Sequence, residues 1–331
     1  MKITVIPGDG IGPSIVDAAL KVLEKAGAGL EYETAVAGRS ALDEGKDLIP
    51  RETIESIERN RIVLKGPLTT PIGEGFTSVN VTLRKMFDLY ANLRPARSFP
   101  GTLSRYEGVD IITIRENTQG MYSGVGQHVS EEGEATAVSV VTREGCRRVL
   151  KFAYETARKK GRKKVTVVNK ANILKSTSGL FLKTSREIAP EYPDIETAEM
   201  LVDNCCMQLV MDPGQFDVIV TTNLFGDIIS DLCAGLVGGL GLTPGANIGN
   251  DAAIFEAVHG SAPDIAGKNI ANPSSLILAS ALMLDHIGMG ERAGNIRSAL
   301  EDVLSTKDRL TPDLGGKGTT GGFTDAVLER L

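Results

Sequence analysis

Short apolar runs alternate with longer segments of helical pattern along most of the chain. Runs rich in β-branched residues, which predict strands, cover residues 3–6, 61–65, 109–116, 164–170 and 216–222. Their apolar positions are consecutive, as in strands that are buried on both faces of a sheet. Helical patterns lie between most of them, the first from about Pro13 to Ala26. This order predicts an α/β protein with a largely parallel sheet, or with two sheets.

Two segments depart from this alternation. Residues 120–141 have the pattern of turns and thin strands. We interpret them as a strand excursion that reaches a partner chain, with a surface hairpin as the alternative. Residues 235–249 hold six glycines in fifteen positions, which indicates tight turns or a close approach of backbones.

The composition limits the classes of protein that fit. The length of 331 residues corresponds to about two domains. Hydrophobic residues make up 42% and charged residues 24%, an ordinary globular balance. The net charge of -6 argues against a nucleic-acid partner. No apolar run approaches the ~18 residues of a membrane span, and the N-terminus MKITVIPGDG lacks the regions of a signal peptide. We therefore expect a soluble protein without a membrane partner or an export signal.

The cysteines and histidines limit the chemistry further. None of the four cysteines stands in a CxxC pair, so we interpret them as reduced and buried in a cytoplasmic protein. Only three histidines occur, which excludes a histidine-rich zinc site. Any metal must then be held by oxygen ligands.

A group of cations stands near the ends of predicted elements. Arg84 lies where a loop runs into a helix, Arg94 follows in LYANLRPAR, and Arg115 ends the strand at 109–116. Guanidinium groups bind carboxylates through paired hydrogen bonds, and Ser78 and Asn80 add neutral donors. The set suits a ligand with several carboxylates. The alternative is that each arginine belongs to a surface salt bridge.

An acidic group is the second candidate for chemistry. Asp227 and Asp231 stand four residues apart in GDIISDL and share one face of a predicted helix, and Asp203 opens another helical run. Two like charges at this spacing repel unless a cation lies between them. Oxygen ligands without histidine favour Mg²⁺ or Mn²⁺. The competing interpretation is that Asp227 caps its helix and Asp231 is simply exposed.

Two further patterns carry weaker signals. Tyr122 and Lys170 are lone polar residues next to strand ends, where a lysine can act as a base. In the stretch from 256 to 267, Gly260 and Ser261 offer donors for a phosphate, and Asp264 offers an acceptor for ribose hydroxyls. A structural turn is the competing interpretation of that stretch.

The glycine-rich turn at residues 7–12 (PGDGIG) does not predict a Rossmann fold. Its third glycine comes one residue early for the G-x-G-x-x-G pattern. We found no acidic residue at the end of a clear second strand to bind a ribose. We therefore interpret this segment as a strand-to-helix turn.

Seven motifs follow one another in the order found in the β-decarboxylating dehydrogenases: GDGIGP, LYANLRP, RENTQGMYSG, NKANILK, NLFGDIISDL, GLTPGANIG and HGSAPDIAGKNIANP. The chain resembles this family, which comprises isocitrate, 3-isopropylmalate and homoisocitrate dehydrogenases, over essentially its whole length. The resemblance implies an isocitrate/isopropylmalate dehydrogenase-like α/β fold, not of the Rossmann type, with two αβ domains and a central cleft. Residues 1–98 and 255–331 would form the large, cofactor-side domain, and residues 99–254 the small domain.

The resemblance also implies roles for single residues. Tyr122 and Lys170 would be the catalytic acid–base pair, and Asp203, Asp227 and Asp231 would hold Mg²⁺ or Mn²⁺. Lys170 and Asp203 would reach in from the partner chain, so that a homodimer, or a higher oligomer, shares its active sites. The substrate would be bound by Thr70, Ser78, Asn80, Arg84, Arg94, Arg115, Tyr122 and Lys170. The cofactor would be bound by Thr69, Thr70, Asn172, His259, Gly260, Ser261, Ala262, Asp264, Ile265 and Asn272.

Two short segments select the substrate and the cofactor within the family. Ser78 and Asn80 resemble the isocitrate-type pattern, in which both contact the γ-carboxylate. The segments DNCCMQLV and TPDLGG look closer to the homoisocitrate branch, so homoisocitrate stays open as a substrate, as does 3-isopropylmalate. Asp264 and Ile265 stand where NADP-type isocitrate enzymes have a Lys-Tyr pair. A carboxylate there accepts from ribose hydroxyls but repels a 2′-phosphate, which favours NAD.

The expected activity is the NAD-dependent oxidative decarboxylation of isocitrate to 2-oxoglutarate and CO₂, a step of the tricarboxylic acid cycle. Two other classes were weighed. A regulatory member of this family typically lacks site residues, whereas the arginines, aspartates, tyrosine and lysine named above are all present. A glycine-rich phosphate-binding module without chemistry predicts no NADH formation with any hydroxy acid.

Overall fold

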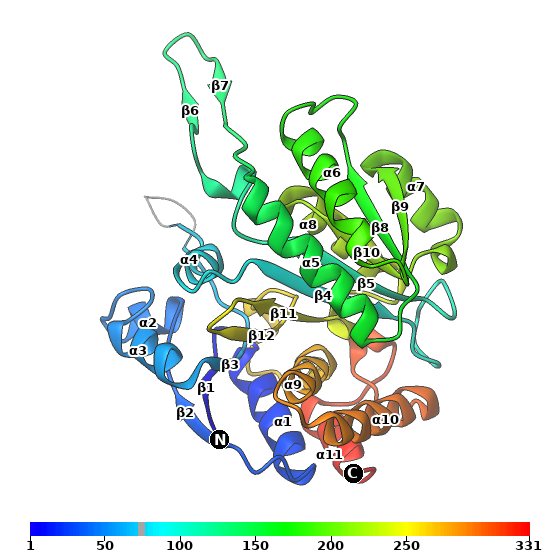
Figure 1. Cartoon of the computed structure of the whole chain (residues 1–331). Helices are drawn as coiled ribbons and strands as arrows, with labels where there is room; N and C mark the ends of the chain where they lie inside the picture. The colour runs from blue at the N-terminus through cyan, green and yellow to red at the C-terminus, as the bar shows by residue number, and fades with distance from the viewer. Residues whose placement is uncertain (72–76) are drawn as a thin grey trace.

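One mixed sheet of ten strands runs through the molecule (Figure 1). The computed structural model describes residues 1–71 and 77–331. From one edge to the other the strands are β2 (Glu31–Thr34), β1 (Lys2–Ile6), β3 (Ile62–Lys65), β12 (Ala253–Ala257), β11 (Pro244–Ile248), β4 (Ala91–Arg97), β5 (Asp110–Glu116), β10 (Val218–Thr221), β8 (Lys164–Asn169) and β9 (Glu196–Leu201).

The sheet consists of two parallel blocks joined by antiparallel strands. Strands β2, β1, β3 and β12 are mutually parallel, and so are β5, β10, β8 and β9. Between the blocks, β11 and β4 pair antiparallel with each other and with their outer neighbours. All five strands expected from apolar runs are present. The expectation of a largely parallel sheet or two sheets was incomplete, because β4 carries polar residues and β11 begins with Pro-Gly, patterns that do not predict strands.

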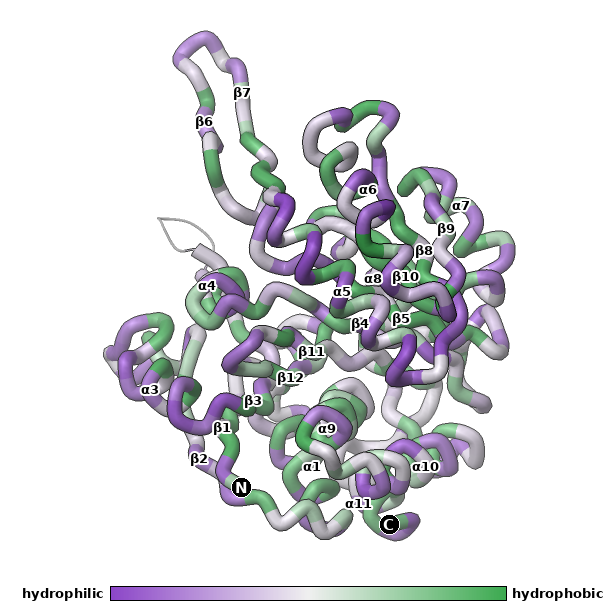
Figure 2. The backbone as a smooth tube through the Cα atoms, viewed as in Figure 1, coloured by the Kyte–Doolittle hydropathy of each residue, from purple (hydrophilic) through white to green (hydrophobic). Residues whose placement is uncertain are grey.

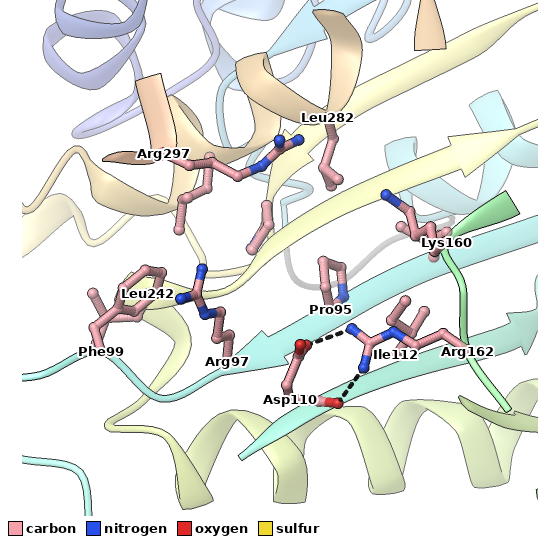
Figure 3. Close-up of a pocket in the computed structure, with 13 residues that line it drawn as sticks. Pro95, Arg97, Phe99, Asp110, Ile112, Lys160, Arg162, Leu242, Leu282 and Arg297 are labelled. Carbon is pink, nitrogen blue, oxygen red and sulfur yellow. Dashed lines mark hydrogen bonds and ion pairs between the residues drawn. The ribbon is translucent and has the colours of Figure 1, made fainter. Parts of the chain in front are cut away.

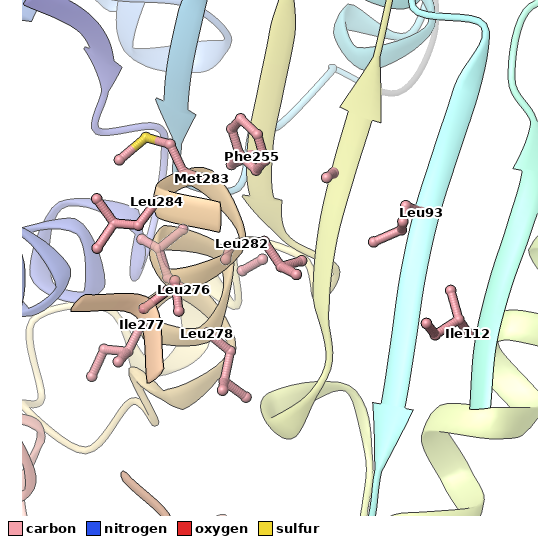
Figure 4. Close-up of a cluster of buried hydrophobic side chains, with 14 of the residues drawn as sticks. Leu93, Ile112, Phe255, Leu276, Ile277, Leu278, Leu282, Met283 and Leu284 are labelled. Carbon is pink, nitrogen blue, oxygen red and sulfur yellow. The ribbon is translucent and has the colours of Figure 1, made fainter. Parts of the chain in front are cut away.

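One face of the sheet is covered by a continuous apolar core. The helices on this face are α1 (Gly12–Lys25), α5 (Arg143–Lys159), α6 (Thr177–Ile188) and α9 (Ser274–His286), with α10 (Gly290–Thr306) and α11 (Thr320–Leu328) packed against them. Helix α9 is buried along nearly its whole length, and Figure 4 shows its leucines between the sheet and the outer helices. Burying one such side chain stabilises the fold by about 1.5–3 kcal/mol. Helices α1 and α11 come from opposite ends of the chain and lie side by side (Figure 1).

The other face of the sheet carries two separate apolar clusters. The first lies under α3 (Arg51–Asn60) and α4 (Val79–Met86), next to which stands the short α2 (Arg39–Asp43). The second lies under α7 (Val202–Met211) and α8 (Asn223–Leu236). The strip of sheet between the two clusters carries polar side chains. The fold therefore leaves the middle of this face free for chemistry.

A narrow hairpin extends from the molecule at residues 120–141, as the sequence predicts. It holds β6 (His128–Val129) and β7 (Ala135–Thr136), and Gly120 pairs with Val140 at its base. Figure 1 shows it standing away from the rest of the chain, and Figure 2 shows hydrophobic and hydrophilic stretches along it. Four of its valines are exposed, among them Val129 at 68%, while Val141 at its base is partly buried.

The sequence also predicted the state of the cysteines, the lack of a membrane span and the division into domains. All four cysteines are free, and burial raises the pKa of Cys146, Cys205 and Cys233 to about 12. Within residues 1–71 and 77–331, no helix has the length and apolar character needed to cross a membrane. The division into 1–98 with 255–331 and 99–254 stays a prediction, since the sheet and its larger core are continuous across it.

Candidate active site

A row of polar side chains crosses the middle of the sheet on the face that carries the two separate clusters. In register, Lys65 on β3 is the neighbour of Glu256 on β12, and Asn247 on β11 is opposite Asn92 on β4. Asn92 in turn lies opposite Arg115 on β5. Side chains alternate between the two faces of a strand, so Leu93 and Phe255 point into the apolar core while this row points away from it.

Three arginines expected to bind carboxylates come together beside this row. Arg94 follows Asn92 by two positions on β4, and Arg84 reaches in from the last turn of α4. Burial and the nearby charge of Arg84 lower the pKa of Arg115 to about 10 and also lower the pKa of Arg94. Arg84 Nε, Arg94 Nε and Arg115 Nη2 are buried and have no hydrogen-bond partner in the described part of the chain. Buried cations with unused hydrogen-bond donors form a binding site for an anion.

Helix α8 supplies the acidic side of the site. A Cβ atom on Gly226 would lie 2.6 Å from Cβ of Arg115, so this glycine lets the helix pack directly over the arginine. The next residue, Asp227, accepts hydrogen bonds from Arg115 Nη1 and from the Tyr122 hydroxyl. Asp231, one turn on, accepts from Arg94 Nη1 at 3.1 Å. The two carboxylates therefore share one face of α8, as expected, and that face meets the arginines.

Burial and the neighbouring charges determine the protonation states of Asp227 and Tyr122. Burial raises the pKa of Asp227, but the charge of Arg115, the hydrogen bond from Tyr122 and the charges of Arg94 and Arg84 together outweigh burial, so the pKa is lowered. Burial and the hydrogen bond to Asp227 raise the pKa of Tyr122. At neutral pH, Asp227 is therefore ionised and Tyr122 keeps its proton. Tyr122 lies in a 3₁₀ turn, Met121–Ser123, and the guanidinium of Arg115 stands 4.8 Å from its ring centroid.

Lys170 and Asp203 form a separate pair in this chain. Lys170 follows β8, and its Nζ donates to Asp203 Oδ1 at 2.6 Å on α7. The hydrogen bond from Lys170 lowers the pKa of Asp203. Neither residue has a hydrogen bond to Tyr122, Asp227 or Asp231 among those between described residues.

The carboxylates in the described part of one chain do not make a complete metal site. In residues 1–71 and 77–331, no three His, Cys, Asp or Glu side chains gather where they could hold a metal ion. Asp227 and Asp231 offer oxygens one turn apart, which suits Mg²⁺ or Mn²⁺, while Asp203 is engaged by Lys170. The residues fit a divalent cation only if a third carboxylate joins the two on α8. This is the arrangement expected if a partner chain supplies its own Asp203.

Loops at the ends of β1, β3 and β12 assemble the expected cofactor side. Asp9, in the PGDGIG turn, accepts from the backbone N–H groups of Arg39, Ser40 and Thr69. The Thr69 and Ser261 hydroxyls lie 2.7 Å apart, and Ile11 N donates to Ser261 O at 2.9 Å. The turn thus holds the loops that carry Thr69 and Ser261, two of the predicted cofactor residues, next to each other.

The remaining predicted residues fall into three places. Thr70 accepts from the backbone of Val79 at the start of α4, which places it beside Ser78 and Asn80. Asn172 is in the exposed loop that follows Lys170. The stretch after β12 carries His259, Gly260, Ser261, Ala262, Asp264 and Ile265, and Asn272 lies just before α9, where it donates to Asp313 Oδ2 at 2.9 Å. Asn172 therefore lies in the loop that follows Lys170, whereas the other predicted cofactor residues lie on different loops.

Three charged side chains that organise the candidate site, Asp9, Lys65 and Glu256, were not predicted from the sequence. Asp9 was included in the glycine-rich turn without a role of its own. Lys65 and Glu256 form a buried ion pair at 2.8 Å. Burial alone raises the pKa of Glu256, but Lys65 and Arg84 lower it to about 2. The sequence could have indicated Lys65 and Glu256, because each is a charged residue in a short and otherwise apolar strand. Charged residues are almost never fully buried unless they are paired.

Cavities lie on both faces of the sheet. A cavity of about 170 Å³ is lined by Lys65, Asn80, Arg84, Arg94, Glu256, His259 and their neighbours. A larger one, of about 330 Å³, lies on the apolar face around Leu93, Ile112 and Leu282 (Figure 3). Its cations already have acidic partners, such as Arg162 with Asp110. We therefore assign the site to the smaller cavity, where polar groups remain unpaired.

The chain is similar in sequence to subunits of mitochondrial NAD isocitrate dehydrogenases. The chain is 50% identical to catalytic subunit 5 of the mitochondrial NAD isocitrate dehydrogenase of Arabidopsis thaliana, over 99% of this chain and 88% of that one. It is 49% identical to a regulatory subunit of the corresponding mitochondrial enzyme of Dictyostelium discoideum, over 100% and 92%. It is 48% identical to the alpha chain of the human mitochondrial enzyme, over 99% and 90%.

These relatives correct one expectation. The chain was predicted to be cytoplasmic, but the curated relatives named here are all mitochondrial proteins, so that prediction is wrong. It rested on reduced cysteines. Free, buried thiols indicate a reducing environment but do not distinguish one such compartment from another.

The fold and the family agree. The crystal structure of isocitrate dehydrogenase from Methylococcus capsulatus superimposes with a TM-score of 0.96 at 56% identity, covering 99% of this chain and 98% of that one. The family model for isocitrate/isopropylmalate dehydrogenases matches residues 2–327. The chain therefore belongs to the isocitrate/isopropylmalate dehydrogenase family and has its fold.

Proposed function

We propose that this protein catalyses the NAD-dependent oxidative decarboxylation of isocitrate to 2-oxoglutarate and CO₂. The observation that carries the proposal is the meeting of three arginines with unused buried donors and the Asp227–Tyr122 pair on one strip of the sheet. Relatives named as NAD isocitrate dehydrogenases, at 48–50% identity, support the choice within the family.

The arginines would bind and orient the substrate. Arg94 and Arg115 come from adjacent strands and Arg84 from α4, so carboxylates on different carbons can each meet a guanidinium. Ser78 stands at the start of α4, and the amide oxygen of Asn80 is buried without a partner among the described residues. The Asn80 NH₂ group would donate to the third carboxylate, which isocitrate has and simpler hydroxy acids lack; the amide oxygen cannot donate and plays no part in that contact.

Two bound groups would complete the chemistry. NAD⁺ would accept a hydride, and Mg²⁺ or Mn²⁺, held by Asp227, Asp231 and a partner's Asp203, would withdraw electron density from the substrate hydroxyl. Lys170 would take the proton of that hydroxyl. After CO₂ leaves, Tyr122 would return a proton to C3. Tyr122 suits this task because it keeps its proton at neutral pH.

We further propose that two copies of this chain share each site across the cleft between the two proposed domains. Exposed apolar side chains on α7 and α8 support such an interface: Met207 is 49% exposed, Leu224 39% and Ile228 53%. Val129 and Val138 on the hairpin add to it. Exposed apolar groups of this kind mark a protein partner. The relatives are named as subunits, so assemblies larger than a dimer fit equally.

The proposed function predicts a defined pattern of substrates. The purified protein is expected to form NADH with isocitrate and NAD⁺, and much less product with homoisocitrate, with 3-isopropylmalate or with NADP⁺. Absorbance of the reduced cofactor measures each rate. EDTA should abolish turnover, and added Mg²⁺ or Mn²⁺ should restore it. A preference for homoisocitrate would reassign the substrate, and turnover that is insensitive to EDTA would remove the metal.

The cofactor preference is expected to depend on Asp264. Replacing Asp264→Lys together with Ile265→Tyr should shift the ratio of kcat/KM for NADP⁺ over NAD⁺ by about 100-fold towards NADP⁺, because a like-charge contact with the 2′-phosphate is replaced by an attraction. Asp264→Asn serves as a matched control that removes the repulsion without adding a cation, and it should give a smaller shift. An unchanged ratio in the double variant would refute this role.

Sharing of the site can be tested by mixing two inactive variants. Lys170→Met and Asp227→Asn homodimers are each expected to lack activity. In a mixed dimer, one of the two sites combines an intact Asp227 with the intact Lys170 of the other chain. Random exchange should therefore recover about a quarter of the wild-type rate. Mixing Lys170→Met with Asp203→Asn is the control, because both lesions would enter the sites from the same side and leave each site one lesion. Absence of recovery in the first mixture would place each site within one chain.

A further inference from the structure

Three buried asparagines stand at the centre of the polar row, and none is assigned a role above. Asn92 on β4, Asn247 on β11 and Asn117 just after β5 are 0%, 2% and 3% exposed. A buried amide is costly unless its donors and acceptor find partners. Their burial directly behind the substrate arginines suggests that the amides serve the site.

The hydrogen bonds of Asn247 fix the direction of its amide. Its Oδ1 accepts from Asn92 Nδ2 at 2.8 Å and from Asn117 Nδ2 at 2.9 Å. An amide NH₂ group cannot accept these bonds, so the two donors determine which end of Asn247 faces them. Its Nδ2 must then point the other way, where it donates to Glu256 Oε1 at 2.6 Å. Nδ2 also donates to Ile254 O at 3.5 Å, so turning the amide over would break four hydrogen bonds.

Glu256 stands between this amide and two cations. Its Oε2 lies 2.8 Å from Lys65 Nζ, and its Oε1 accepts from Asn247 Nδ2 and faces Arg84. Arg84 Nη2 remains 3.6 Å from Oε1, beyond hydrogen-bond distance. A void of about 10 Å³ is bounded by Asn247, Arg84, Glu256 and Lys65. The hydrogen bond from Asn247 thus holds Oε1 in a position from which it does not reach hydrogen-bond distance of Arg84.

We propose that Asn247 is a positioning residue, which holds Oε1 of Glu256 and so leaves the Arg84 guanidinium free to bind a carboxylate of the substrate. This inference rests on the proposed function of the same site. Without the amide, Glu256 would turn towards Arg84 and form a full buried ion pair. That pair would compete with the substrate for the same donors. Asn92 and Asn117 contribute by fixing the orientation of Asn247.

The test separates substrate binding from the chemical step. Asn247→Leu, which keeps the volume but removes the amide, should raise KM for isocitrate about tenfold and leave kcat within about twofold. Asn247→Asp still accepts from Asn92 and Asn117 but adds a negative charge near Arg84, so its KM should rise further than that of the leucine variant. Thr166→Val on β8, another buried change of a polar to an apolar group, is the matched control and should leave KM unchanged.

A double-mutant cycle tests whether the effect passes through Arg84. In an Arg84→Gln background, Asn247→Leu should add no further rise in KM, because the guanidinium it protects is gone. Additive effects would overturn the proposal. Results that fit a purely structural role for Asn247 would also overturn the proposal. In that case Asn247→Leu would be more damaging than Asn247→Asp, and kcat and Tm would fall while KM rises. If Asn247→Leu does not fold, Asn247→Asp carries the same cycle. Failure of the proposed function would show separately, as a wild-type protein that does not oxidise isocitrate.

Discussion

Replacing Arg115 by alanine is expected to weaken substrate binding by about 2–5 kcal/mol, as for the loss of one partner of a buried charge pair. This corresponds to a rise of about 30- to 4,000-fold in Kd. The effect should be large because Arg115 is 1% exposed and one of its nitrogens has no partner in the described residues. Calorimetric titration of the metal-loaded protein with isocitrate measures the change directly.

Two variants sharpen this expectation. Arg115→Lys keeps the charge but not the planar fork, and it should recover only part of the affinity. Arg51→Ala removes an arginine whose side chain is 90% exposed and pairs with Glu55 on α3, and it should leave Kd unchanged. If Arg115→Ala binds isocitrate as the wild type does, the arginine group is not the substrate site.

Replacing Tyr122 by phenylalanine is expected to lower kcat by about 10²- to 10⁴-fold, the usual contribution of a positioned acid or base. The change removes one hydroxyl, the group that donates to Asp227 and keeps its proton at neutral pH. The ring stays, and with it the contact of Arg115, so the affinity for substrate should change little. Steady-state rates of NADH formation, together with Kd from titration, distinguish the two quantities.

The matched control for Tyr122 is Tyr106→Phe. Tyr106 also loses one hydrogen bond, from its hydroxyl to Val210 O at 2.6 Å, but it stands outside the site. Its kcat should match that of the wild type. A Tyr122→Phe variant with near-normal kcat would exclude the hydroxyl as the acid and would direct attention to Lys170.

Much of the local structure could be predicted because it depends on short stretches of chain. The apolar run at 216–222 became β10, and the spacing of Asp227 and Asp231 placed both on one face of α8, as the periodicity requires. The turns and thin strands expected within residues 120–141 likewise became a hairpin, with strands at 128–129 and 135–136. The roles of Tyr122, Lys170 and the three aspartates came from the resemblance to a family and stay predictions.

The joining of the two parallel blocks was beyond prediction from pattern. Strands β4 and β11 have sequences that do not resemble strands, yet they hold the centre of the sheet. Asn92 and Asn247 are hydrogen-bonded across 155 positions of sequence, and no local signal records such a pairing. The same holds for Lys65 with Glu256 and for Asp9 with the Thr69 loop.

The sequence by itself determined where the buried parallel strands β1, β3, β5, β8 and β10 form and which charged groups are available, because hydrophobic periodicity acts over a few residues. Only the tertiary structure decided that one sheet face is divided into two apolar clusters with a polar row between them. The physical reason is that strand order and register are chosen by packing between distant segments. That packing determines which polar side chains are removed from water together and must therefore form hydrogen bonds with one another.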